Sequence, residues 1–110
     1  MIVANDPTHG APSPIGQGRD ITPIAAVRAR AFSIPTDAPE ADGTFEWHAT
    51  TLVVVEIDAG GCTGLGYTYT DACAAALIAE TLAPELLHGD AASIRALNQR
   101  LWRRVRNIGR

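Results

Sequence analysis

The sequence contains no lysine, and its nine basic residues are all arginine. The chain therefore offers no lysine to form a Schiff base or to act as a general base. Its two cysteines are too few for a disulfide scaffold, so we expect a reduced, cytoplasmic setting. No apolar run approaches the roughly 18 residues of a membrane span, and the first residues lack the pattern of a signal peptide. We therefore expect neither a membrane protein nor a disulfide-rich secreted protein.

Charge is unevenly distributed along the 110 residues, which have room for one domain. All twelve acidic residues lie in residues 1–90 with three arginines, whereas residues 91–110 hold six arginines and no acid. Such a basic segment binds nucleic acid in some proteins. It is more often a solvated helix face or a face that meets an acidic partner. We expect no nucleic-acid partner.

The first half of the chain divides into a leader, a strand and a loop. Residues 1–20 are rich in proline and glycine and poor in apolar side chains, so we expect a disordered leader before a domain of residues 21–110. Residues 21–34 alternate weakly and predict a strand that ends at Pro35. Residues 35–46 hold two prolines, one glycine and four acids, which predicts a long loop.

Two further strands follow this loop. The stretch from Trp47 to Asp58 is rich in β-branched residues and is the strongest strand candidate. Gly60 and Gly61 favour a tight turn, after which residues 62–68 predict a short returning strand. The three strands most simply form an antiparallel meander.

The periodicity becomes helical after the third strand. Residues 71–82 are rich in alanine and predict a helix capped by Thr70 or Asp71. Pro84 is expected to break this helix and to start a short second one that ends at Leu87. Ser93 is a plausible cap for a last helix, whose apolar stripe is Ile94, Leu97, Leu101, Val105 and Ile108. The predicted fold class is α+β: a three-stranded antiparallel β-meander followed by a small helical bundle.

The residues alone carry little recognisable chemistry. The histidines and cysteines lack the ligand spacing of a structural zinc site, so we expect no metal bound by this chain alone and expect Cys62 and Cys73 to be buried. No serine or cysteine has the partners of a nucleophile. The acids of residues 35–46 offer a carboxylate pair, although an exposed acidic loop is more often only solvated. These residues indicate a non-catalytic module with one long polar loop.

Three stretches resemble a known family. They are the run Ile-Pro-Thr-Asp-Ala-Pro-Glu-Ala-Asp-Gly-Thr-Phe-Glu-Trp of residues 34–47, the pattern Val-Val-Glu-x-x-x-Gly-Gly-x-x-Gly-x-Gly of residues 54–66, and the closing residues 102–110. They resemble the amino-terminal domain of the enolase superfamily, in its mandelate racemase and muconate-lactonising branch. The likeness covers about residues 21–110.

This resemblance implies a domain that caps a modified (β/α)₈ barrel, with residues 35–47 and 66–70 closing over the substrate. In such enzymes the barrel holds Mg²⁺ and the base that removes a proton α to a carboxylate. The sequence ends at Arg110, where that barrel would begin. We therefore expect the capping and specificity domain of a Mg-dependent acid-sugar dehydratase or racemase-type enzyme, inactive as this fragment, whose partner is a barrel domain.

The resemblance also implies a set of residues that contact a carboxylate or acid-sugar substrate. On one side these are Thr36, Asp37, Thr44 and Trp47, and on the opposite rim Tyr67, Thr68 and Tyr69. Core packing is the alternative role for the tryptophan. Strand alternation places both tyrosines on one face, so one of them has a structural alternative.

Two other functions remain open from the sequence. The chain is alternatively a stand-alone binding or assembly module without catalysis. An arginine-rich nucleic-acid binder would depend only on residues 95–110. A capping domain without its barrel exposes an apolar surface, so we also expect self-association.

Overall fold

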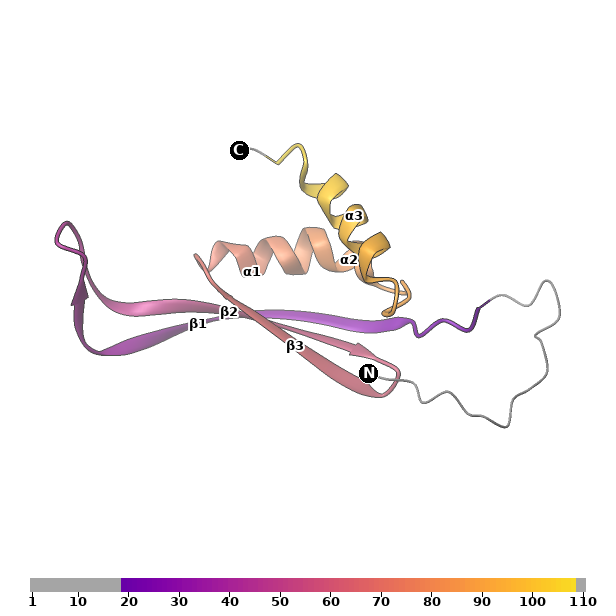
Figure 1. The fold of residues 1–110 in the computed structure, drawn as a ribbon, viewed down its shortest axis with the longest axis horizontal. Helices are drawn as coiled ribbons and strands as arrows, with labels where there is room; N and C mark the ends of the chain where they lie inside the picture. The colour runs from indigo at the N-terminus through magenta and orange to yellow at the C-terminus, as the bar shows by residue number, and fades with distance from the viewer. Residues whose placement is uncertain (1–18, 109–110) are drawn as a thin grey trace.

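A computed structural model describes residues 19–108. The predicted leader falls almost wholly outside these residues. Three strands precede a helical layer, which confirms the predicted α+β meander (Figure 1). The elements are β1 (Ile24–Ala41), β2 (Glu46–Ala59), β3 (Cys62–Tyr69), α1 (Cys73–Leu77), the π-helical segment η1 (Ile78–Leu82), α2 (Ala83–Leu86) and α3 (Ile94–Val105).

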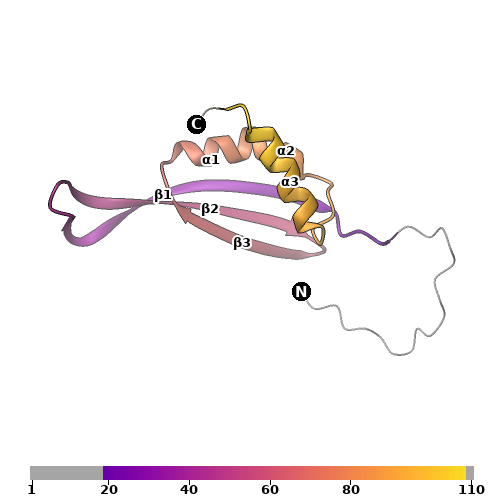
Figure 2. The same ribbon diagram turned by 45° about the horizontal axis from the view of Figure 1, so that its top comes forward.

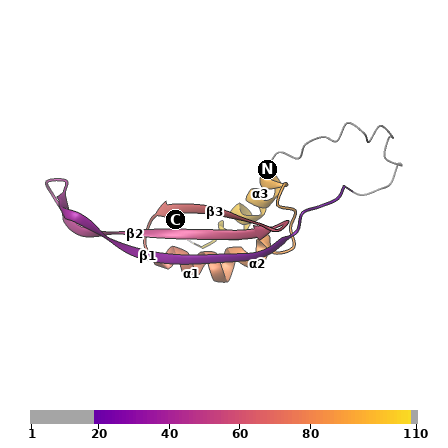
Figure 3. The ribbon, with the colours of Figure 1, turned by 90° about the horizontal axis from the view of Figure 1, so that it is seen from below.

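The sheet is antiparallel with the strand order β1-β2-β3, as predicted (Figure 3). Gly60 and Gly61 connect β2 to β3 with φ angles of 58° and 76°. Glycine adopts this left-handed region without a steric penalty, which explains the tight two-residue turn. The turn fixes the register of β3 against β2, from Ala59 opposite Cys62 onward.

The predicted loop of residues 35–46 is wrong, because β1 continues past Pro35. After an irregularity between Pro35 and Glu40, the strand pairs again, with Glu40 opposite Trp47. Prolines are tolerated here because β1 is an edge strand and the ladder is already interrupted. Residues 35–49 thus form a hairpin that projects beyond the helices (Figure 1), hereafter the arm.

The helical segment runs without interruption from α1 through η1 to α2. The predicted short helix at Pro84 is confirmed as α2, whereas the predicted break before it is wrong. The N-cap position of α1 is Ala72, one residue after the predicted Asp71, and no side chain caps the helix there. The Asp71 carboxylate still accepts the backbone N–H of Cys73 at 2.8 Å. Ala83 N–H bonds to the Ile78 carbonyl in a π turn immediately before the proline. Pro84 then lies in the first turn of α2, where its missing N–H is tolerated.

The helices cover one face of the sheet (Figure 2), and the core lies where they meet the start of β1. Ile24, Leu86 and Leu97 form its buried cluster. Partly buried side chains surround this cluster: Val27, Ile57, Ala59, Ala91 and Leu101. Only the middle of the predicted α3 stripe therefore packs, because Ile94 and Ile108 at its two ends are exposed.

The segment after α2 binds the start of β1 through its backbone. Ile24 N–H donates to the Gly89 carbonyl, and His88 N–H donates to the Ile24 carbonyl, both at 2.9 Å. The Asp90 carboxylate accepts the Thr22 N–H and the Ser93 hydroxyl, so Ser93 precedes α3 without capping it by its side chain. We call this packed region, the buried cluster with residues 88–91, the junction.

The sheet face opposite the helices is uncovered. Large apolar and aromatic side chains are exposed on it: Phe32, Ile34, Leu65, Tyr67 and Tyr69. At its far end Arg28 binds Asp58 and Glu56, which lowers the pKa of Asp58 to about 2. None of the described helices is long and apolar enough to cross a membrane.

Cys62 and Cys73 are free and exposed, so the prediction that they are buried is wrong. Cys62 opens β3, and no described helix contacts that strand. Cys73 begins α1, where the Asp71 carboxylate lies against it. This carboxylate raises the pKa of the Cys73 thiol.

Candidate functional site

A hollow of about 570 Å³ lies where the arm leaves the rest of the sheet. It contains three of the seven residues predicted to contact a substrate, Thr36, Trp47 and Tyr69. The complete lining is Ile34, Pro35, Thr36, Glu40, Trp47, Thr50 and Tyr69. Apolar walls with a few polar groups are typical of small-molecule sites.

Strand register explains why these residues meet. Ile34 pairs with Thr50 across β1 and β2, and Glu40 pairs with Trp47 beyond the irregularity. Tyr69 pairs with Leu52, two residues from Thr50, so both side chains lie on the same sheet face. The hollow therefore draws on β1, β2 and the end of β3.

The indole of Trp47 is fixed within the arm. Its Nε1 donates to the Glu40 carboxylate at 2.9 Å, and the ring stacks on Phe45 at a centroid distance of 6.2 Å. Trp47 is half-buried and is not part of the core cluster at the junction. The arm thus presents this ring as a wall of the hollow.

Thr36 carries an unpartnered polar atom. Its Oγ1 is buried and has no hydrogen-bond partner among the described residues. Leaving a buried hydroxyl unpaired costs free energy, on the order of 1–3 kcal/mol. The atom can therefore donate to or accept from a group that enters the hollow.

The three residues predicted for the opposite rim separate in the structure. Tyr67 and Tyr69 lie on one face, as alternation requires, with their rings edge to face at 6.4 Å. Both remain about two-thirds exposed, and only Tyr69 lines the hollow. Thr68 lies on the other sheet face, opposite the buried Val53.

Asp37 and Thr44 do not line the hollow. Thr44 lies in the tip of the arm, where its hydroxyl donates to the Asp42 carboxylate at 2.7 Å. The same carboxylate accepts the backbone N–H groups of Thr44 and Phe45, and these bonds lower the pKa of Asp42. Asp37 is exposed on the arm.

Sequence reasoning missed Glu40 and Thr50 as members of this site. Glu40 had been grouped with the solvated acids of a loop. Its cross-strand position opposite Trp47 was the available signal, and it becomes visible only when residues 35–49 are recognised as a hairpin. Thr50 pairs with Ile34, so its place follows from the same register.

The hollow has a distinct electrostatic character. Glu40 is the single charged group among its lining residues, and no cation lines it. It therefore suits hydroxyl groups better than a free carboxylate. Within residues 19–108 no three histidine, cysteine or acidic side chains gather to hold a metal ion. A Mg²⁺ site, which needs several oxygen ligands, does not fit these residues alone.

Comparison with solved structures decides the family. A mandelate racemase/muconate lactonizing enzyme-like protein from Rubrobacter xylanophilus is 39% identical over 80% of this chain, with a TM-score of 0.76. A racemase from Streptomyces coelicolor A3(2), solved with bound magnesium, is 35% identical over 79% of this chain, with a TM-score of 0.74. The chain belongs to the enolase superfamily.

Within the superfamily, this domain matches the amino-terminal capping domain of the mandelate racemase and muconate lactonizing enzyme group. A muconate lactonizing enzyme from Pseudomonas fluorescens, complexed with muconolactone, shares the fold at 23% identity and a TM-score of 0.70. The chain spans about a quarter of each of these solved chains, 24% to 26%. No family model matches it, and no curated protein matches it.

Proposed function

We propose that this enolase-superfamily domain caps the active site of a Mg-dependent acid-sugar dehydratase or racemase-type enzyme and sets its substrate specificity. The hollow at the base of the arm carries the proposal. There the unpartnered Thr36 hydroxyl, the Glu40 carboxylate and the Trp47 indole meet on one side, with the Tyr69 phenol on the other. The 35% sequence identity to a racemase solved with bound magnesium supports the same assignment.

The chemistry of the hollow favours the hydroxyl-bearing part of a substrate. Glu40 uses one oxygen for the Trp47 indole and retains acceptor capacity for a hydroxyl group. The absence of a lining cation means that a substrate carboxylate must be neutralised elsewhere. In the proposed enzyme, Mg²⁺ held by residues outside this domain supplies that charge.

The proposed role of the domain is enclosure, without a lysine or histidine base. Closing the arm and the end of β3 over a substrate would exclude water and strengthen the electrostatic interactions beneath them. The chain has no lysine, and the hollow contains no histidine. The barrel domain is therefore the proposed partner, and the isolated domain is proposed to be catalytically silent. Its two free, exposed cysteines support a cytoplasmic location.

A chimera tests this function. Residues 19–108 would replace the matching amino-terminal quarter of the Streptomyces coelicolor racemase. Exchange of the substrate α-proton for deuterium, followed by proton NMR, would report proton abstraction for any carboxylic acid tested. The panel would pair polyhydroxy acids with acids of equal length that lack the distal hydroxyls. We expect exchange in the chimera with Mg²⁺, preference for the hydroxylated acids, and no exchange with the isolated domain.

Variants of the chimera locate the specificity. Thr36→Val is expected to raise KM for the polyhydroxy acid by roughly 2- to 10-fold, because one hydrogen bond is lost. The KM for the acid without distal hydroxyls should stay unchanged. Ser33→Ala is the matched control, since Ser33 is on the same strand and outside the hollow. Equal kinetics for Thr36→Val and Ser33→Ala, or a chimera without preference between the two acids, would contradict the proposal.

A further inference from the structure

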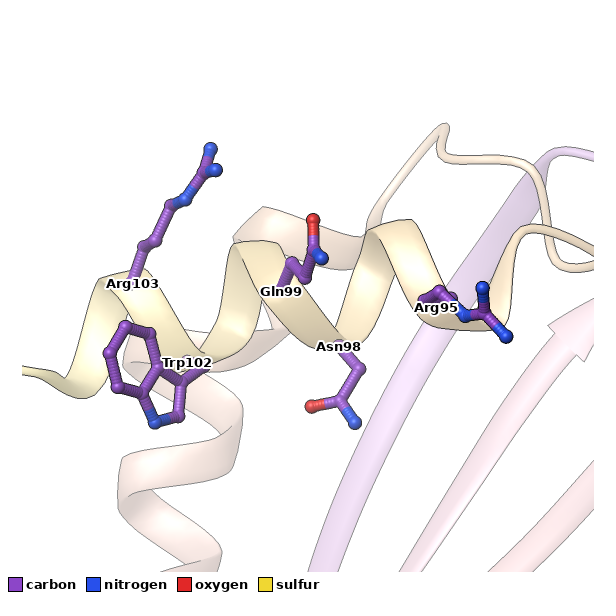
Figure 4. Close-up of a pocket in the computed structure, with 5 residues that line it drawn as sticks. All are labelled: Arg95, Asn98, Gln99, Trp102 and Arg103. Carbon is purple, nitrogen blue, oxygen red and sulfur yellow. The ribbon is translucent and has the colours of Figure 1, made fainter.

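The outward face of α3 exposes an aromatic side chain and cationic side chains that the proposed capping function does not use. Trp102 is 63% exposed on it, beside a hollow of about 370 Å³. Figure 4 shows the residues that line this hollow on successive turns of α3: Arg95, Asn98, Gln99, Trp102 and Arg103. We call these five residues the α3 face. An exposed tryptophan between arginines is typical of protein interaction surfaces.

In the part of the chain that the structure describes, the arginines of the α3 face have no acidic partner. Glu85 binds two other arginines. Its carboxylate lies 3.6 Å from Arg104 Nε, and its backbone carbonyl accepts a hydrogen bond from Arg100 Nη1 at 2.9 Å. Among residues 19–108, no carboxylate forms a salt bridge with Arg95 or Arg103. The α3 face therefore presents cations to whatever docks there.

The arm has the complementary composition. It holds four acids and no arginine: Asp37, Glu40, Asp42 and Glu46. His48 lies 3.4 Å from the Glu46 carboxylate and is the one basic side chain within the arm. At the tip, Phe45 is 68% exposed. The acidic arm with its aromatic tip thus matches the cationic and aromatic α3 face.

The arm cannot make this contact within one molecule. In all three views the tip of the arm lies at one end of the sheet and α3 lies over the other half (Figures 1, 2 and 3). We propose that the arm of one copy, with Phe45 at its tip, docks on the α3 face of a second copy. Phe45 then lies against Trp102, and the Asp37 and Glu46 carboxylates face Arg95 and Arg103.

This contact joins two different surfaces, so it is heterologous and leaves a free tip and a free α3 face on each pair. Such assemblies grow into rings or open chains as the concentration rises. Exposed charge pairs are screened by salt, with a Debye length of about 10 Å at 0.1 M and about 3 Å at 1 M. The proposed assembly is therefore concentration-dependent and weakens with ionic strength. It uses the same arm as the capping function proposed above, but it does not depend on that function being correct.

Sedimentation velocity of the purified chain, at low and high salt, tests the proposal. One variant reverses the charge of the α3 face, R95E/R103E, and a second reverses two acids of the arm, D37R/E46R. Each alone is expected to stay monomeric at low salt. An equimolar mixture is expected to associate again, because each variant keeps the surface that the other has lost. Glu80→Arg is a charge-reversal control on the helical layer and is expected to associate like the original chain.

Circular dichroism melting would establish that each variant is folded, and R95Q/R103Q replaces the first variant if it is not. A chain that is monomeric at every concentration and salt would overturn the proposal. Association that persists in both charge-reversal variants would also overturn the proposal. It would assign the contact to the uncovered sheet face opposite the helices. Failure of the mixture to associate, together with an R95E/R103E-sensitive shift of duplex DNA, would assign the α3 face to nucleic acid instead.

Discussion

The junction and the arm belong to the same sheet but are stabilised in different ways. At the junction, Ile24, Leu86 and Leu97 are buried, and backbone hydrogen bonds join β1 to residues 88–91. In the arm every side chain is exposed except those of Thr36 and Trp47, which are half-buried. Burial of apolar area is the main source of stability, so the junction is the more stable of the two regions. The arm depends on ladder bonds and local side-chain contacts, and it gains most from a partner.

Leu97→Ala is the change with the largest expected effect on this comparison. It removes a buried side chain from the centre of the junction cluster. Core truncations of this kind cost about 2–5 kcal/mol of unfolding free energy. Phe45→Ala at the tip of the arm should cost far less, because that ring is exposed. Urea denaturation of both variants measures the difference, and equal losses would show that the arm contributes to the core.

Substitutions at two glycines compare a crowded position at the junction with an open position on β3. A Cβ on Gly89 would lie 2.8 Å from Leu97 Cδ2 and 3.0 Å from the Leu86 carbonyl oxygen, so it crowds the junction. Gly89→Ala is expected to cost about 1–3 kcal/mol, the usual range for overpacking. Gly66→Ala on β3 meets nothing within 4 Å and should be close to neutral. Thermal melting of the two variants measures which one loses more stability. A destabilised Gly66→Ala together with an unaffected Gly89→Ala would contradict the prediction.

Acid should loosen the tip of the arm before the junction. Hydrogen bonds lower the pKa of Asp90 at the junction as well, but the buried cluster there does not depend on a carboxylate. The Asp42 carboxylate accepts three hydrogen bonds in the turn, which lower its pKa. A lowered folded-state pKa adds stability above the unfolded pKa of about 3.9, and this is lost as the pH falls through the folded value. Amide NMR between pH 6 and pH 2 should show Thr44 and Phe45 shifting early. Simultaneous loss of tip and junction signals would contradict the separation.

The smallest expected effect is on cysteine reactivity. Asp71 raises the pKa of the Cys73 thiol, so less of it is thiolate near neutral pH. Asp71→Asn should therefore speed the alkylation of Cys73 by iodoacetamide, by a few-fold, because the thiolate is the nucleophile. Mass spectrometry would follow this site, with Cys62 in the same sample as the internal control. A rate unchanged by the substitution would show that the carboxylate does not act on the thiol.

The sequence was sufficient for the parts of the fold set by local pattern. The β-branched residues of β2, the Gly60-Gly61 turn and the apolar spacing at the centre of α3 each predicted the observed element. The errors have a common origin in tertiary context. Pro35 and Pro84 signalled breaks, but an irregular edge strand and a π turn accommodate them. Which ends of the α3 stripe pack depends on where the other helices lie.

The candidate site was only partly predictable for the same reason. Trp47 and Tyr69 were identified through the family resemblance, and both line the hollow. Glu40 joined them only through its register opposite Trp47 in a hairpin that had been predicted as a loop. Thr68 was separated from Tyr69 by simple alternation, which the sequence already contained. Their contribution to substrate binding stays a prediction.

Amide hydrogen exchange of the arm tests the central claim most directly. It would compare residues 35–49 in the isolated chain and in the racemase chimera, with the junction as the internal reference. The account predicts that the junction exchanges slowly in both proteins. It predicts that the arm exchanges fast in the isolated chain, at concentrations where the chain is monomeric. In the chimera, exchange of the arm should slow when an acid ligand binds. An arm as protected as the junction in the isolated monomer, or one unchanged by ligand in the chimera, would contradict it.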